Sequence, residues 1–413
     1  MKIVGLITEY NPFHLGHKLH LEESLRITGA DHSVCIMSGS FVQRGEPAIV
    51  DKWTRARMAV EGGVDLVLEL PFIFAAQSAE VFAYGGVRLL DSTNCVDHLA
   101  FGSEEGMIDT LDSVADLLVD ESEPFKFLLK KHLSLGNSFS TARSLAITET
   151  MKISGKNPME IREAIAKPNN ILGIEYLKAL KRLDSKIKPI TFKRIGHGYK
   201  DTSTDQGIAS ATAVRRLLLN DETSSTKMLL PESSYELLMD FYSEYGKFNC
   251  IDNYTDLIRY LVRKESQDEL LQYMDMETGL ENRLKRLASK SYSAEELVSQ
   301  SITKRYPGTR IRRLLIHIMT GMKKNFIEEA LERTPEYVRV LASNTKGFEI
   351  INEIKRSSDL KVITKFSDAP STLSNVSKAM LEKEVLATDV YYLALKDGSS
   401  SFGKDFSISP YIK

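Results

Sequence analysis

The chain has 413 residues, of which 42% are hydrophobic and 27% are charged, and its formal net charge is −2 at pH 7. This length leaves room for two or more domains with separate cores, and the composition is ordinary for a globular protein. The near-neutral charge excludes a uniformly basic coat for nucleic acid, but it is compatible with local basic patches.

Three cysteines, Cys35, Cys95 and Cys250, lie far apart in the sequence. This spacing favours reduced, buried thiols over a disulfide framework or a zinc site. No stretch approaches the ~20 apolar residues of a membrane span, and Glu9 interrupts the only apolar candidate for a signal peptide. We therefore expect a cytoplasmic protein without a membrane segment.

The first predicted strand, residues 3–7, leads through a loop marked by Pro12 into the tetrad His14-Leu15-Gly16-His17, and a helix is expected over 16–27. At a helix N-terminus, free backbone N–H groups and the helix dipole can hold a phosphate. Two imidazoles one turn apart suit a nucleoside triphosphate and the charge that develops as pyrophosphate leaves. The alternative is a pair of structural histidines in a helix cap, which the position after an N-terminal strand disfavours.

Strands and helices alternate through the first half of the chain. Further strands are predicted over 33–37, 64–70, 95–101 and 187–195, and helices over 53–61, 78–90 and 170–183. This alternation predicts an α/β fold with a Rossmann-like parallel sheet covered by helices on both faces. Ligands of such sheets bind beyond the carboxyl ends of the strands, where this chain carries turns rich in glycine or hydroxyl groups.

The second half has a different pattern. Residues 105–168 are mostly helical and interrupt the alternation as an insertion, and strand patterns nearly vanish after about Asp221. We expect residues 1–225 to form the nucleotide-binding domain and residues 226–413 a separate, mainly α-helical domain with a C-terminal tail. The tail, residues 397–413, is expected to be either mobile or docked as an extended segment.

A second candidate phosphate contact follows the fifth predicted strand. Ser210, Thr212 and Arg215 form the pattern Ser-x-Thr-x-x-Arg at the start of a helix. Ser210 is a good N-cap, and the planar guanidinium of Arg215 could clamp the β- and γ-phosphates. Taken alone, the pattern favours plain helix capping; its pairing with His-x-Gly-His in one fold favours a nucleotide site.

A basic stretch lies in the predicted helical domain. No acidic residue occurs between Glu296 and Glu328, whereas seven basic ones do: Lys304, Arg305, Arg310, Arg312, Arg313, Lys323 and Lys324. A solvated helix face explains the periodicity but not the missing acids, so a polyanionic partner is modestly favoured. The loop from Lys152 to Lys156 looks like the lysine-rich mobile loop of class I aminoacyl-tRNA synthetases, but an ordinary solvated loop is the better interpretation there.

These motifs together resemble the HIGH-type nucleotidyltransferase superfamily and, within it, the tRNA(Met) cytidine acetate ligase family. The family resemblance rests on TEYNPFHLGHK at 8–18, SGSFVQRGEPA at 38–48, AFGSE at 100–104, KPNNILGIEY at 167–176, RIG at 194–196 and RRLLIH at 312–317. It covers nearly the whole chain, including the helical C-terminal half. His197 is the one departure, at a position where a smaller residue is expected.

The resemblance implies that ATP activates acetate as acetyl-adenylate and that the acetyl group passes to N4 of wobble cytidine 34 in elongator tRNA(Met). His14, His17 and Arg215 would be catalytic, by stabilising phosphate charge. Ser210 and Thr212 would complete the ATP site, for which the resemblance implies Ile7, Thr8, Glu9, Tyr10, Asn11, Pro12, Phe13, His14, Leu15, Gly16, His17, Lys18, Leu19, His20, Gly102, Asn169, Arg194 and Ile195.

The same resemblance makes the helical domain and its basic stretch the holder of the tRNA. Mg²⁺ is expected to accompany ATP, and no carboxylate cluster predicts a protein-borne metal. Two other functions stay open at this point. The first is a small-molecule adenylyltransferase, which would need only the first half of the chain, and the second is a non-catalytic RNA-binding protein.

Overall fold

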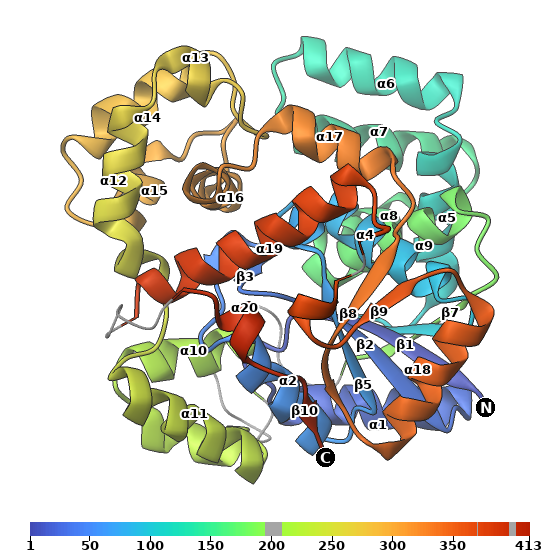
Figure 1. Ribbon diagram of the computed structural model, residues 1–413. Coiled ribbons are helices and arrows are strands. Elements are labelled where there is room, and N and C mark those ends of the chain that lie inside the picture. The colour runs from blue at the N-terminus through green and yellow to red at the C-terminus, as the bar shows by residue number, and fades with distance from the viewer. Residues whose placement is uncertain (195–208, 370, 396–401) are drawn as a thin grey trace.

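The computed structural model describes residues 1–194, 209–369, 371–395 and 402–413. Its centre is an eight-stranded sheet in the order β10-β8-β5-β2-β1-β6-β7, with β9 paired to β8 (Figure 1). The strands of this sheet are β1 (Ile3–Thr8), β2 (His32–Ser38), β5 (Leu66–Leu70), β6 (His98–Ser103), β7 (Lys188–Lys193), β8 (Tyr337–Ser343), β9 (Lys361–Ile363) and β10 (Tyr411–Ile412). A separate two-stranded hairpin consists of β3 (Phe41–Val42) and β4 (Glu46–Pro47).

The five predicted strands form one parallel block of the sheet, which confirms the α/β, Rossmann-like prediction. From β1 the chain adds β2 and then β5 on one side, and returns to add β6 and β7 on the other. The strand order therefore reverses between β1 and β6, where open α/β sheets bind their ligands. The loop after β1 lies at this switch point.

Crossover helices connect these strands: α1 (Leu15–Thr28), α2 (Lys52–Glu61), α3 (Phe72–Ala75), α4 (Ala79–Ser92) and α9 (Pro168–Arg182). Helix α4 packs closely on β1, with a glycine at each point of contact. A Cβ on Gly5 would lie 2.9 Å from Leu90 Cδ1, and one on Gly86 would lie 2.8 Å from Ile7 Cγ2. Glycine at both positions permits this approach, which fixes the end of β1 against the helix.

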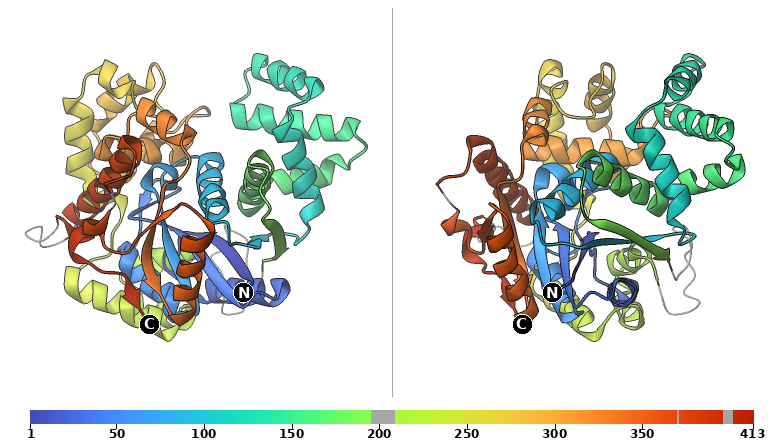
Figure 2. Two further views of the ribbon diagram at one scale, coloured as in Figure 1. Left: turned by 45° about the vertical axis from the view of Figure 1, so that its right-hand side comes forward. Right: turned by 90° about the vertical axis from the view of Figure 1, so that its right-hand side faces the viewer.

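Between β6 and α9 the chain forms the helices α5 (Ile108–Val119), α6 (Glu123–Ser134), α7 (Phe139–Ile153) and α8 (Pro158–Ala166). A second helical group follows β7 and runs through the elements α10 (Ala211–Leu219), η1 (Thr223–Leu229), α11 (Glu232–Tyr245), η2 (Ile251–Tyr254), α12 (Thr255–Lys264), α13 (Gln267–Leu270), α14 (Leu280–Ala288), α15 (Ala294–Ser301), α16 (Gly308–Thr320) and α17 (Lys324–Glu332). Figure 2 shows α5–α8 and α12–α15 as two groups that project from the same side of the molecule.

The expectation that strands nearly vanish after Asp221 is wrong for the last quarter of the chain. Strand β8 is wholly buried and pairs antiparallel with β5, while β9 and β10 pair with β8. Without β8 the edge of β5 would present unpaired N–H and C=O groups, so this segment completes the sheet rather than joining a helical body. Three α-helices and one 3-10 helix accompany these strands: α18 (Thr345–Ser357), η3 (Phe366–Asp368), α19 (Asn375–Leu393) and α20 (Lys404–Ser407).

The two halves of the chain also share one hydrophobic core. A single cluster of buried side chains extends from Ile3 in β1 to Leu395 after α19. No core boundary therefore marks residue 225, and the division of the chain there remains a prediction. In the part of the chain that the structure describes, no helix combines the length and apolar character that crossing a membrane requires.

A buried ion cluster attaches the C-terminal segment to the sheet. Lys52 Nζ lies 2.8 Å from Glu69 Oε1 and 2.8 Å from Asp405 Oδ1, and Arg339 contacts the same two carboxylates. All four side chains are nearly inaccessible to water. Residues 402–413 are thus docked on the body, which decides between the two expectations for the described part of the tail.

Candidate functional site

The two histidines of the tetrad cap helix α1 reciprocally. His14 is the N-cap residue, and its Nδ1 accepts a hydrogen bond from Gly16 N at 3.0 Å. His17, three residues on, accepts from His14 N at 3.3 Å through its own Nδ1. The two rings stack with their centroids 3.7 Å apart. The capping interpretation is therefore correct for the Nδ1 atoms.

Capping uses the Nδ1 atom of each ring, so the Nε2 atom on the opposite edge is not needed for the cap. A neutral imidazole that accepts at Nδ1 carries its proton on Nε2, so both rings present an Nε2–H donor. Burial, followed by the charges of Arg194 and Arg215, lowers the pKa of His14 to about 3. Burial and the neighbouring His14 lower the pKa of His17 well below its usual value. Both rings are thus neutral hydrogen-bond donors near pH 7.

The hydrogen-bond donors available to a phosphate differ in one respect from those that the sequence predicts. The Gly16 N–H is taken by His14 Nδ1, and the N–H groups of His17 and Lys18 bond to the His14 carbonyl. The backbone amides of Gly16, His17 and Lys18, which were predicted to be free for phosphate, are therefore occupied. The Nε2–H groups of the two rings are additional candidate donors.

Aromatic packing and a side-chain hydrogen bond hold the loop between β1 and α1 in place. The ring of Tyr10 packs edge-on against Phe13 at 4.8 Å and His17 at 5.0 Å between centroids, and the Asn11–Pro12 peptide bond is cis. Asn11 Oδ1 accepts from Ile49 N at 2.7 Å. This packing fixes the direction in which the histidine rings face.

A fully buried arginine that the sequence analysis did not identify holds this loop to its neighbour. Arg55 in α2 donates to the carbonyl oxygens of Glu9, Ser38, Gly39 and Val50. It thereby joins the carboxyl ends of β1 and β2. Four of the ten residues of α2 are charged, so the sequence gave no sign that Arg55 in particular would be buried beside this loop.

Residues from β6, α9 and β7 meet on one side of the tetrad. Arg194 Nη1 donates to Asn169 Oδ1 at 2.9 Å, and Asn169 Nδ2 donates to Glu104 Oε1 at 2.8 Å. A Cβ on Gly102 would lie 2.7 Å from Arg194 Cγ, so only glycine admits this arginine. Glu104, the last residue of the AFGSE stretch, was not among the predicted ATP-site residues.

Arg215 approaches from the other side. Ser210 caps α10 by accepting from Ala213 N at 3.2 Å, as the pattern predicts. One turn into α10, Arg215 Nη1 donates to the Asn11 carbonyl at 2.9 Å, and Nη2 lies 3.4 Å from Thr212 Oγ1. The guanidinium is thereby held against the loop that carries His14.

The structure thus brings together most of the expected ATP-site residues. Ile7 and Thr8 end β1, while Leu15, Gly16, Lys18, Leu19 and His20 lie in the first two turns of α1. Burial and then Arg194 lower the pKa of His20 to about 4, so His20 is also close to this arginine. Ile195 and His197 lie outside the described residues.

The basic stretch is neutralised in three dimensions, and the inference of a concentrated positive surface from its missing acids is wrong. Arg305 and Arg310 pair with Glu277, Arg313 pairs with Asp275, and Arg312 pairs with Glu295. Their partners come from a different part of the fold, residues 275–295, and Arg313 is only 9% exposed. Lys323 pairs with Glu265 and Lys324 with Glu328, while Lys304 is exposed. A role of these residues in binding tRNA remains a prediction.

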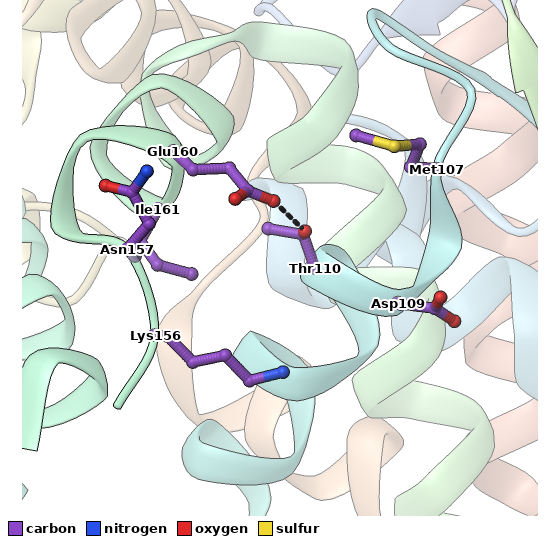
Figure 3. Close-up of a pocket in the computed structure, with 7 residues that line it drawn as sticks. All are labelled: Met107, Asp109, Thr110, Lys156, Asn157, Glu160 and Ile161. Atoms are coloured by element: carbon purple, nitrogen blue, oxygen red, sulfur yellow. Dashed lines mark hydrogen bonds between the residues drawn. The ribbon is translucent and has the colours of Figure 1, made fainter. Parts of the chain in front are cut away.

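One cavity, of about 270 Å³, lies away from the histidine tetrad, between α5 and the start of α8. Figure 3 shows Glu160 and Thr110 joined by a hydrogen bond of 2.7 Å, with Lys156 extending from the loop before α8. The Lys152–Lys156 loop is therefore near this cavity rather than near His14. Within the described ranges, no group of three or more histidine, cysteine or acidic side chains is placed to hold a metal ion.

The fold and the site define a nucleotidyltransferase of the HIGH type. A switch point of a Rossmann-like sheet carries a stacked His-x-x-His pair, and the charges of Arg194 and Arg215 act on its first histidine. Consistent with this class, the family model described as HIGH Nucleotidyl Transferase matches residues 1–405.

Relatives and solved structures narrow the class. A tRNA(Met) cytidine acetate ligase of Acetivibrio thermocellus is 41% identical over 403 residues, which cover 96% of each chain. One of Thermoanaerobacter sp. is 41% identical over the full length of both chains. The crystal structure of apo Thermotoga maritima TmcAL has a TM-score of 0.95 and 33% identity, covering 100% of this chain and 99% of that one. The same protein bound with alpha-thio ATP has a TM-score of 0.93 and 32% identity.

The chain belongs to the tRNA(Met) cytidine acetate ligase family. The resemblance and the fold class drawn from the sequence are therefore confirmed, and the family is one of ligase enzymes.

Proposed function

We propose that this enzyme uses ATP to activate acetate and transfers the acetyl group to N4 of cytidine 34 in elongator tRNA(Met). In the first step an acetate oxygen attacks the α-phosphorus, the bond to the β-phosphate breaks, and pyrophosphate leaves with the bonding electrons. In the second step the cytidine amine attacks the acetyl carbonyl, AMP leaves, and the amine loses a proton, giving N4-acetylcytidine.

One observation carries the first step. His14 and His17 cap α1 through their Nδ1 atoms, and the charges of Arg194, just after β7, and of Arg215, in α10, act on His14. Neutral donors and permanent cations in fixed positions are suited to the negative charge that builds on the phosphates as pyrophosphate departs. Pre-positioned donors need no reorganisation at that moment, because capping already fixes both rings.

By the family resemblance, the remaining residues of the 7–20 loop, with Gly102, Asn169, Arg194 and Ile195, hold ATP, and Ser210 and Thr212 lie beside its phosphates. We expect Mg²⁺ to arrive with the nucleotide, and we expect the enzyme to act in the cytoplasm. The relative that was solved with an ATP analogue supports the nucleotide assignment.

The second step needs an RNA surface within reach of the site. The cluster formed by Lys304, Arg305, Arg310, Arg312, Arg313, Lys323 and Lys324 is our candidate, although most of its charges already have partners. The partners of Arg305 and Lys324 can be exchanged for phosphates, because these two pairs are exposed and such pairs contribute only ~0–1 kcal/mol. Lys304 and Lys324, both exposed, are the members from which we expect the most direct contacts.

The test is incubation of the full chain with ATP and labelled acetate, with and without elongator tRNA(Met). We expect acetyl-adenylate and pyrophosphate without RNA, and labelled RNA when it is added. A transcript with uridine in place of cytidine 34 is the matched control, since it lacks the N4 amine and should stay unlabelled. Adenylylation of a phosphorylated metabolite in place of acetate would overturn the proposal in favour of a small-molecule transferase.

A further inference from the structure

The β3–β4 hairpin lies between the nucleotide loop and helix α16. Its strands pair Phe41 with Pro47 and Val42 with Glu46. Gly45, in the turn, has φ +76°, and a Cβ there would lie 2.2 Å from Arg313 N. The turn is thus in direct contact with the backbone of the basic helix, and no residue other than glycine fits it without movement.

The other side of the hairpin contacts the loop after β1. Gln43 N donates to Glu9 Oε1 at 2.8 Å, and the chain just past β4 donates from Ile49 N to Asn11 Oδ1 at 2.7 Å. Asn11 is the residue whose carbonyl receives Arg215. One small element therefore contacts the candidate ATP site and the candidate RNA helix at the same time.

Glu46 is the charged residue at the centre of this contact. Its Oε2 lies 3.5 Å from Arg215 Nη2, and its Oε1 lies 4.0 Å from Arg312 Nε. The Glu46 side chain is 30% exposed, Arg215 15% and Arg312 21%, so water screens these charges only in part. Arg312 has a second carboxylate partner, Glu295, which does not pair with Arg215.

We propose that Glu46 is a positioning residue through which anion binding at Arg215 and anion binding at Arg312 oppose each other. This inference rests on the proposed function, in which a triphosphate occupies Arg215 and an RNA phosphate occupies Arg312. It adds a regulatory link between two sites that the proposed function treats separately.

The link follows from one carboxylate that lies near the guanidiniums of both Arg215 and Arg312, with Arg44 of the same hairpin also within range of its charge. A triphosphate on Arg215 displaces Glu46, whose charge then turns to Arg312, where an incoming RNA phosphate must displace it again. By linkage, RNA bound first makes Glu46 a stronger competitor for Arg215 by the same factor. Departure of pyrophosphate returns Glu46 to Arg215 and frees Arg312, so productive RNA binding follows activation.

The experiment measures binding, not turnover. The affinity of fluorescently labelled elongator tRNA(Met) for the full chain is titrated with and without saturating α,β-methylene ATP, in the absence of acetate. We expect the analogue to weaken tRNA binding about fivefold, the low end of typical coupling factors, because all three side chains keep some contact with water.

Two glutamine variants then separate the two partners of Arg312. In Glu46→Gln we expect tighter binding of both ligands and an analogue effect below about twofold. In Glu295→Gln we expect tighter tRNA binding with the analogue effect unchanged. A third variant, Arg312→Met, should weaken binding of tRNA, which loses a phosphate contact, and also binding of the analogue, because Glu46 loses the guanidinium that competes with Arg215.

The inference is overturned if the wild-type affinity for tRNA is the same with and without the analogue, if the analogue strengthens it, or if Glu46→Gln keeps the full effect. The labelled-acetate assay of the proposed function does not depend on this coupling. Acetylated tRNA together with uncoupled binding would therefore reject the role of Glu46 and leave the proposed function standing.

Discussion

Replacing His14 by asparagine or by glutamine should separate the two uses of its ring. Asparagine places an oxygen where Nδ1 accepts from Gly16 N, and it is a strong N-cap residue, but it has no group at the position of Nε2. Glutamine reaches the Nε2 position with a donor and caps poorly. The two variants thus remove opposite halves of one side chain.

The magnitudes follow from the contacts. Losing a helix cap costs about 1 kcal/mol of unfolding free energy, so His14→Gln should be less stable by about that amount and His14→Asn should be nearly unchanged. Losing one fixed donor to a developing oxyanion slows the reaction by about 10²- to 10³-fold. We therefore expect His14→Asn to lose that factor in rate and His14→Gln to lose less than about tenfold.

The assay is acetate-dependent exchange of labelled pyrophosphate into ATP, alongside urea denaturation of each variant. His14→Ala is the reference, since it removes both the cap and the donor. If His14→Asn exchanged pyrophosphate at the wild-type rate, the Nε2–H group would have no part in phosphate stabilisation. The histidine pair would then be structural only.

Three further outcomes are expected. Gly102→Ala should displace Arg194 and raise the KM for ATP roughly tenfold, because one hydrogen bond to a charged group is lost. The melting temperature should change little. An unchanged KM would show that Arg194 does not bind ATP. Asp405→Asn should lower the unfolding free energy by about 3–5 kcal/mol in urea denaturation, because two buried cations lose one of the two carboxylates that they share. Glu61→Gln, which loses only the contacts to the chain end, should cost ~1 kcal/mol or less. His20 has a pKa of about 4 in the folded chain against 6.5 when unperturbed, so its contribution to stability is present above pH 6.5 and is lost as the pH falls towards 4; His20→Asn should flatten the fall of stability across that window, and an unchanged slope would contradict the pKa shift.

The parallel half of the fold could be predicted because its elements are local in sequence. Strands β1, β2 and β5 are short apolar runs, and β1, β2 and β6 end on glycine or hydroxyl residues. Strand β8 was not predicted because Arg339 stands between Val338 and Val340 and because helical patterns surround the segment. Its alternation of Val338 and Val340 was the available signal. The charge of Arg339 is compensated by Glu69 and Asp405, which no local pattern connects to it.

The candidate site shows the same limit. The tetrad and Arg215 carry recognisable spacing, whereas Arg55 binds four carbonyl groups that belong to three separate segments. The charge of the basic stretch was misjudged for a related reason. Counting acids along the chain omits Glu277 and Glu295, which lie close in space to arginines some 15 to 35 residues further on.

The spacing of the tetrad itself has a structural explanation. In a reciprocal cap the second side chain must reach back to the N-cap N–H, which only the third helical residue can do. His14 and His17 occupy those two positions, and the cap turns each Nδ1 towards the backbone. One additional residue between them would carry the second ring past the cap, freeing it to rotate and exposing its Nδ1. The interval that makes the helix start stable is thus the interval that fixes two Nε2–H donors side by side at the switch point of the sheet.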